Sequence, residues 1–155
     1  MPFEPFIVTA ALPPNIHSWA DGLRTAHYPA ERNHLRAHVT LFHALAPSLF
    51  AEVQSVIPSF ARDNAPPSAE INGLLKWDTG TAIALDSPAM LAIREDIADH
   101  FHGSLTAQDL HEPRLHITVQ NKVTPRQAKM PQAELEPQIE RRTFCLLYTS
   151  DAADD

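Results

Sequence analysis

Apolar residues recur along the chain with two different periods, and each period predicts a different kind of element. An unbroken run of β-branched and apolar residues at 6–12 predicts a buried strand. Between residues 16 and 26 the apolar side chains recur three and four positions apart, which predicts an amphipathic helix that begins near Pro14. Apolar and polar residues alternate over residues 35–42, which predicts a second strand.

Prolines are expected to interrupt two further helices. A short helix is predicted over residues 48–57, and Pro58 should end or kink it because proline removes a backbone donor. Residues 124–140 begin like a capped helix, but Pro131 and Pro137 are expected to break it into pieces.

The second half of the chain repeats the order of the first half. Runs at 69–77 and 81–87 predict a hairpin, and the helix that follows has Ser87 as its N-cap. The buried stripe of this helix is expected to consist of Met90, Ile93, Ile97 and Phe101. A strand over 114–122 completes the pattern. Each half thus reads strand, proline-initiated helix and strand, which predicts a duplicated α+β chain.

A five-residue phrase, Arg-x-His-x-Thr, occurs in one strand of each half, in RAHVTLF and RLHITVQ. Its histidines, His38 and His116, lie 78 positions apart, which is about half of the chain. Because side chains on a strand alternate between faces, each copy should bury an aliphatic face and present its polar residues on the other. The residues expected on the two polar faces are Arg36, His38 and Thr40, and Arg114, His116 and Thr118.

This pairing suits in-line displacement at a phosphodiester. One imidazole can act as the base on the attacking oxygen while the other acts as the acid on the leaving oxygen. Threonine hydroxyls can hold the non-bridging oxygens, and an arginine can bind phosphate in a bidentate manner. Acid, base and anion clamp are then all present, so no metal ion or other cofactor is expected. The alternative is that His38 and His116 are hydrogen-bonded core histidines, and the extra triplet His102-Gly103-Ser104 shows how easily such motifs arise.

The paired motifs HVTL, with His38 and Thr40, and HITV, with His116 and Thr118, resemble those of the 2H phosphoesterase superfamily. Within it, the chain is most similar to the branch of RNA 2′,3′-cyclic phosphodiesterases and 2′-5′ RNA ligases. The resemblance implies one bilobal domain over residues 1–155, with antiparallel sheets flanked by helices around a central cleft. It also implies that the four motif residues are catalytic.

The activity implied by the resemblance is metal-independent opening of 2′,3′-cyclic phosphates at RNA 3′ ends to 2′-phosphates. The reverse reaction would join ends through a 2′-5′ bond. By the same analogy we assign His116 as the base that activates water and His38 as the acid, while the pseudo-symmetry leaves the reverse assignment open. Two other functions stay open: hydrolysis of a small cyclic nucleotide such as ADP-ribose cyclic phosphate, and a non-catalytic module that binds RNA ends.

Five residues beside the motifs are candidates for substrate binding. They are Arg36, Arg114, Phe42, Gln120 and His34. Phe42 and Gln120 continue the two polar faces and are expected to contact a base, with core packing as the alternative for Phe42. His34 is expected to line the cleft. His34 and His38 have the spacing of a helical metal-binding pair, but their local pattern is loop and strand, so no metal site is predicted.

Composition limits the partners and the compartment. The chain has 155 residues, a formal net charge of −7 and one cysteine, Cys145. An acidic protein lacks the basic face that binds long duplexes, so an RNA 3′ end or a small cyclic nucleotide is the expected partner. The single cysteine excludes an internal disulfide. With no signal peptide or membrane span in the pattern, we expect a cytoplasmic monomer without membrane attachment.

The end of the chain departs from what the resemblance implies. Members of the family usually end with a further strand and a stretch like Arg-Tyr-x-Gly-Gly-x-Trp, whereas this chain ends in CLLYTSDAADD. This ending resembles translated adaptor read-through. Residues from about 144 onward are therefore expected to be non-native, and the loss of a strand would expose a sheet edge.

Overall fold

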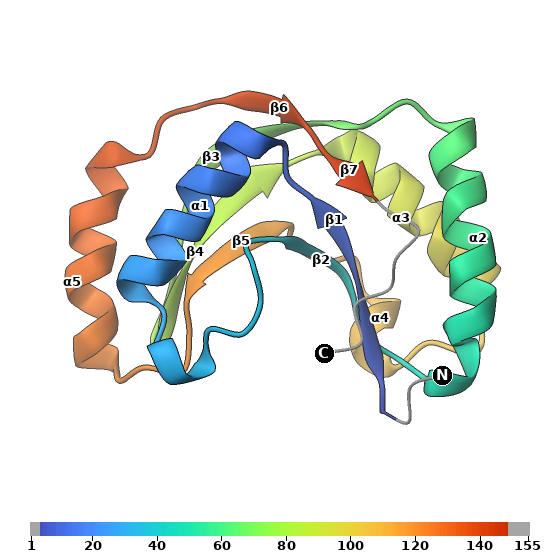
Figure 1. The fold of residues 1–155 in the computed structure, drawn as a ribbon, viewed down its shortest axis with the longest axis horizontal. Helices are drawn as coiled ribbons and strands as arrows, with labels where there is room; N and C mark the ends of the chain where they lie inside the picture. Colours follow the sequence, from blue (N-terminus) through green and yellow to red (C-terminus); the bar gives the residue numbers. More distant parts are fainter. Residues whose placement is uncertain (1–3, 149–155) are drawn as a thin grey trace.

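The computed structural model describes residues 4–148 and shows two antiparallel sheets that form a curved arch flanked by helices (Figure 1). The three-stranded sheet has the order β2-β1-β7, and the four-stranded sheet has the order β5-β4-β3-β6. The strands are β1 (Phe6–Ala11), β2 (Val39–Leu45), β3 (Ser68–Trp77), β4 (Gly80–Asp86), β5 (His116–Gln120), β6 (Thr143–Cys145) and β7 (Leu147–Tyr148). The predicted α+β class, with antiparallel sheets and flanking helices, is confirmed.

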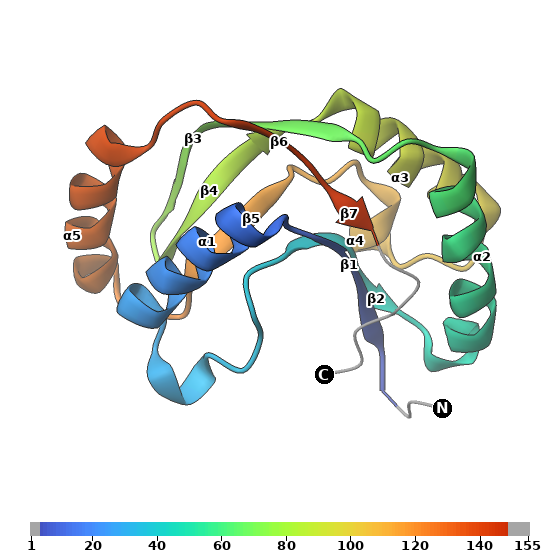
Figure 2. The same ribbon diagram turned by 45° about the horizontal axis from the view of Figure 1, so that its top comes forward.

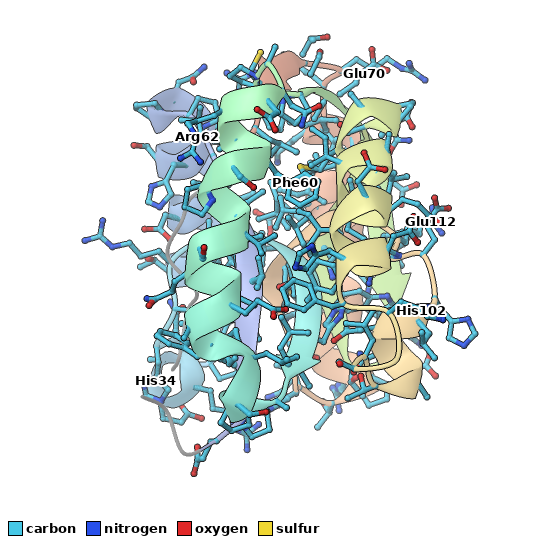
Figure 3. The ribbon with its side chains drawn as sticks, turned by 90° about the vertical axis from the view of Figure 1, so that its right-hand side faces the viewer. His34, Phe60, Arg62, Glu70, His102 and Glu112 are labelled. Carbon is cyan, nitrogen blue, oxygen red and sulfur yellow. The ribbon has the colours of Figure 1, made fainter. Side chains whose placement is uncertain are left out.

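Helices lie at both ends of the arch. Helices α1 and α5 lie at one end, and α2 and α3 lie side by side over the other (Figures 1, 2 and 3). Nε2 of His100 in α3 lies 3.5 Å from Oε2 of Glu52 in α2, so a polar contact joins these two helices. The helices are α1 (Pro14–His27), α2 (Phe50–Asp63), α3 (Pro88–His100), α4 (Ala107–Leu110) and α5 (Pro125–Leu135), with short 3-10 turns η1 (Ala30–Arg32), η2 (Pro47–Leu49) and η3 (Glu136–Gln138).

The two motif strands, β2 and β5, meet at the middle of the arch. Each is the edge strand of its own sheet, and the two contact each other (Figures 1 and 2). Two helices pack against a strand of the opposite half of the chain. Helix α1 follows β1 but packs against β5, and α3 follows β4 but contacts β2 through Arg94. A helix from one half of the chain therefore supports the motif strand of the other half.

One continuous hydrophobic core joins both sheets. Leu41 of β2, Ile83 of β4 and Ile117 of β5 are all fully buried in it. Burial of an aliphatic side chain of this size stabilises the fold by about 1.5–3 kcal/mol. The predicted stripe of α3 is also confirmed, because its four residues are at most 6% exposed: Met90, Ile93, Ile97 and Phe101.

Helices α2 and α5 run through Pro58 and Pro131, so the predicted end at Pro58 and the predicted break at Pro131 are wrong. The break expected at Pro137 is confirmed, because α5 ends at Leu135 and η3 follows. A kink at Pro58 stays a prediction. Proline removes the N–H group that would bond to the carbonyl four residues earlier. For Pro131 that carbonyl belongs to Gln127, and the side-chain amide of Gln120 donates to it instead at 3.3 Å. For Pro58 the corresponding residue, Gln54, lies on the exposed face of α2, where water can serve as the donor.

Residues 143–148 add a strand to each sheet. β6 pairs with β3, and β7 pairs with β1. Phe144 is 8% exposed and Leu146 is fully buried, so this segment packs into the core. The expectation that residues from about 144 onward are non-native stays a prediction, and its last part, residues 149–155, lies outside the described residues.

Candidate active site

Each motif segment buries alternate residues and leaves its polar residues accessible, as the alternation predicts, although Arg36 and His38 precede β2 and Arg114 precedes β5. The arginines are exposed, while the histidines and threonines are half-buried. The intervening residues are at most 4% exposed: Ala37, Val39 and Leu41 in the first copy, and Leu115, Ile117 and Val119 in the second. We use the name motif face for the half-buried polar positions of the two segments together: His38 and Thr40 in one, and His116 and Thr118 in the other.

Each motif histidine is held by the backbone of its own segment. Nδ1 of His38 lies 2.6 Å from the carbonyl oxygen of Arg36, and Nδ1 of His116 lies 2.6 Å from that of Arg114. A carbonyl oxygen only accepts, so Nδ1 carries the proton and donates it in both rings. In a neutral ring Nε2 is then the atom that can accept a proton. The duplication thus extends from the sequence to the geometry of the side chains.

The imidazole of His116 packs against the indole ring of Trp77 in β3. The two rings pack edge to face, with centroids 5.2 Å apart and an angle of 87° between their planes. Burial lowers the pKa of the His116 imidazole, and electrostatic repulsion from the neighbouring His43 and Arg114 lowers it further, against the opposing hydrogen bond to the Arg114 carbonyl. A lowered pKa keeps this imidazole neutral near pH 7, which is the state that a general base needs.

A β-bulge follows the threonine of each motif and ends the alternation there. β2 has one extra residue between Thr40 and Phe42 relative to β1, and β5 has one between Thr118 and Gln120 relative to β4. Phe42 is fully buried and Gln120 is 3% exposed. The prediction that these two residues continue the polar faces is therefore wrong. Core packing, the stated alternative, therefore fits Phe42, while Gln120 still lines a pocket beside His27 and Lys122. Contact of either residue with a base stays a prediction.

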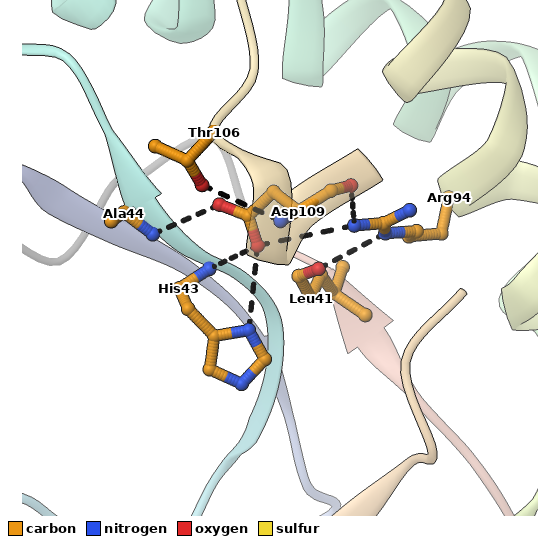
Figure 4. A network of polar contacts seen from close by, with 6 residues as sticks. All are labelled: Leu41, His43, Ala44, Arg94, Thr106 and Asp109. Carbon is orange, nitrogen blue, oxygen red and sulfur yellow. Dashed lines mark hydrogen bonds and ion pairs between the residues drawn. The ribbon is translucent and has the colours of Figure 1, made fainter. Parts of the chain in front are cut away.

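Asp109 of α4 is fully buried behind His43, which follows the bulge in β2 (Figure 4). Its carboxylate accepts the backbone N–H groups of His43 at 2.8 Å and Ala44 at 3.0 Å, and lies 3.4 Å from Nδ1 of His43. Arg94 lies 4.0 Å from the carboxylate and donates to the carbonyls of Leu41 and Asp109. Burial raises the pKa of Asp109, but the hydrogen bonds from His43 and Ala44 outweigh it, and the pKa lies below its ordinary value.

Arg24 of α1 repeats the arrangement of Arg94 in the other half of the molecule. The two residues are 4% and 3% exposed, and burial lowers the pKa of both guanidinium groups. Arg24 donates to the carbonyl of Thr118 at 2.9 Å and lies 4.3 Å from the ring of Tyr28, as Arg94 lies 4.3 Å from the ring of Phe42. Each half therefore supplies a buried arginine that holds the opposite motif strand at or next to its threonine.

The remaining candidate residues lie on the surface. Arg36 and Arg114 are exposed beside the motif histidines, and His34 is exposed in the loop before β2; their contacts with substrate stay predictions (Figure 3). His102, of the extra His-x-Ser triplet, projects outward after α3 (Figure 3). Within residues 4–148, no three His, Cys, Asp or Glu side chains come close enough together to hold a metal ion.

Asp109 and the two buried arginines were not found from the sequence. The four residues of α4 are too few to show a helical period. The arginines did leave a signal, since a charge stands within an apolar stripe: Arg24 follows Ile16 and Ala20 at intervals of four. A charge at such a position must find buried partners, and the carbonyls of the opposite motif strand provide them.

The comparison with protein-family models identifies the family of the chain. The model of the 2′-5′ RNA ligase superfamily matches residues 12–151. Because the match spans most of the chain, the protein belongs to the 2′-5′ RNA ligase superfamily, whose members are generally 2H phosphodiesterases. Comparisons with curated proteins and with solved structures gave no significant match. Among the described residues, no helix is long and apolar enough to cross a bilayer.

Proposed function

We propose that the protein is a metal-independent phosphodiesterase that opens 2′,3′-cyclic phosphates at RNA 3′ ends to 2′-phosphates. The observation that carries the proposal is the matched pair of imidazoles, each bound through Nδ1 to a backbone carbonyl at 2.6 Å. His38 lies immediately before β2 and His116 begins β5, and these two strands contact each other. Two imidazoles fixed in the same tautomer can supply the base and the acid of one displacement. Membership of the superfamily supports phosphodiesterase activity in general.

In the proposed reaction, water attacks phosphorus in line with the 3′ oxygen of the ribose. His116, which burial beside Trp77 keeps neutral, takes a proton from the water through Nε2. The bond between phosphorus and the 3′ oxygen breaks as the new bond forms, and protonated His38 gives its Nε2 proton to that oxygen. The product is a 2′-phosphate with a free 3′ hydroxyl. Proton exchange with solvent resets the pair. The same displacement would form a 2′-5′ bond if the 5′ hydroxyl of a second RNA, in place of water, attacked the phosphorus.

The threonines and arginines would bind the phosphate. Thr40 and Thr118 lie half-buried on the motif face, where their hydroxyls can donate to the non-bridging oxygens. Arg36 and Arg114 are exposed next to the histidines and would add positive charge where the anion binds. This local charge matters because the chain carries a formal net charge of −7, which repels polyanions at long range.

Product analysis with a short RNA tests this proposal. The purified protein is incubated with an RNA that ends in a 2′,3′-cyclic phosphate, with and without excess chelator. We expect a mass gain of one water, a product whose new end is sensitive to phosphatase, and the same rate in chelator. Strict metal dependence, or an unchanged cyclic end, would contradict the proposal. A parallel reaction with ADP-ribose cyclic phosphate shows whether the substrate is instead a small nucleotide.

A further inference from the structure

A pocket of about 230 Å³ lies beside His38, between β1, the start of α1 and the segment that precedes β2. Its walls combine aliphatic and polar side chains, and His38 itself lies among them. The other lining residues include Ile7, Thr9, Ala11, His17, Leu35 and Arg36. The pocket is smaller than the roughly 300–1,000 Å³ that drug-sized ligands occupy, so it suits a single flat ring system.

The register of β1 and β2 shows how this pocket relates to the motif face. In β1 the residues alternate between buried and half-buried, and Ile7, Thr9 and Ala11 are the half-buried ones. Thr9 pairs directly with Thr40. Side chains paired in this way have Cβ atoms about 4.5–5.5 Å apart, so the pocket begins one strand away from the proposed phosphate clamp. This is the distance at which the sugar and base of a bound nucleotide follow its phosphate.

The equivalent surface of the other sheet is covered. Ala82 of β4 pairs with Thr118 as Thr9 of β1 pairs with Thr40. Around Ala82, however, Ala84 and Leu75 form a small apolar cluster against which Trp77 packs. The cluster residues are at most 9% exposed. Two otherwise similar halves therefore differ at this point: the half with His38 has an open pocket, and the half with His116 has a tryptophan.

We propose that this pocket binds the nucleobase of the nucleotide whose cyclic phosphate is opened. The proposal rests on the proposed function. Ile7 and Leu35 supply apolar walls for the faces of the base, while the Thr9 hydroxyl and the His17 imidazole supply hydrogen bonds for its polar edge. The ribose then lies on the side of His38 and the attacking water on the side of His116. This geometry makes His38 the acid that protonates the departing ribose oxygen.

Two substrates separate the pocket from the proposed function: a nucleoside 2′,3′-cyclic phosphate, and ribose 2′,3′-cyclic phosphate, which lacks the base. We expect kcat/KM of the wild-type protein to be at least about tenfold higher for the substrate with a base. If neither substrate is hydrolysed although an RNA with a cyclic 3′ end is, the pocket does not recognise the terminal nucleotide and the nucleobase assignment is overturned. If that RNA is not hydrolysed either, the proposed function fails. If both are hydrolysed equally well, the nucleobase pocket alone is overturned.

Variants of the pocket test its location. Ala11→Leu fills it, and we expect this change to reduce the preference for the base to about onefold to threefold. Thr9→Val, which keeps the size of the side chain, and His17→Ala should lower the preference at least about threefold, mainly through KM. His27→Ala, on the same helix but outside the pocket, is the matched control and should keep the wild-type preference. The assignment is overturned if the folded pocket variants keep the full preference, or if His27→Ala loses it equally. Circular dichroism verifies that each variant is folded. If Ala11→Leu does not fold, Thr9→Val and His17→Ala decide the question.

Discussion

Replacing Asp109 tests how the end of β2 is held. Asp109→Asn keeps the size of the side chain, but an amide has one acceptor oxygen where the carboxylate has two. One of the N–H groups of residues 43 and 44 therefore loses its acceptor, at about 1–3 kcal/mol. The charge of Arg94 is also left without its anion, and breaking a buried pair costs about 3–5 kcal/mol. Because Arg94 keeps two carbonyl acceptors, the cost of its lost partner should fall below that range, and we expect a total loss of about 3 kcal/mol in the free energy of unfolding.

The second step is to remove the cation. Arg94→Met leaves the Asp109 carboxylate without its positive neighbour, and the carbonyl of Leu41 without its donor. We again expect a loss of about 3 kcal/mol. In the double variant neither charge is left alone, so its loss should fall short of the sum of the single losses by at least about 1 kcal/mol.

Urea unfolding followed by circular dichroism measures all four proteins. A coupling energy within about 0.5 kcal/mol of zero would refute the reasoning, because independent sites add to within that margin. Acid gives a second check on the sign. The pKa of Asp109 is lowered from 3.8, so below about pH 4 the unfolded chain takes up a proton before the folded one does. Stability should therefore fall more steeply in acid for the wild type than for Asp109→Asn; parallel curves would contradict this.

Three further changes test the site itself. Trp77→Leu should expose His116 and raise the pKa of its imidazole. The acid limb of the plot of kcat/KM against pH should then move to higher pH. If that limb does not move, the tryptophan does not set the pKa of His116. Thr40→Val and Thr118→Val should each lower kcat by about 10²–10³ if the hydroxyls bind the phosphoryl oxygens in the transition state, and an effect on KM alone would contradict that role. Gln120→Leu should cost about 1–3 kcal/mol of stability, because it leaves buried hydrogen-bonding groups unpaired. We expect kcat/KM to stay close to that of the wild type. A selective rise in KM would show that Gln120 binds substrate.

Features that depend on neighbouring residues in the sequence were predictable. The alternation of both motif segments correctly assigned their buried and polar faces, because strand geometry alone decides it. Ser87 was correctly placed as the N-cap of α3, where its hydroxyl accepts the N–H of Met90 at 3.2 Å.

Features that depend on a distant partner were not predictable. The bulges after Thr40 and Thr118 exist only relative to β1 and β4, so alternation carried too far assigned Phe42 and Gln120 to the wrong face. Pro131 was read as a break because the amide that compensates for it, from Gln120, comes from another strand. The exchange of helices between the halves is likewise a property of the tertiary fold.

The rate of cyclic-phosphate opening in single histidine variants tests the central claim most directly. His38→Ala and His116→Ala are compared with His102→Ala, which alters the exposed triplet after α3 and serves as the matched control. General acid or base catalysis contributes about 10²–10⁴-fold, so each motif variant should lose at least about a hundredfold in kcat while the control keeps the wild-type rate. If both motif variants open the cyclic end of an RNA as fast as the control, the two imidazoles are not the acid and the base.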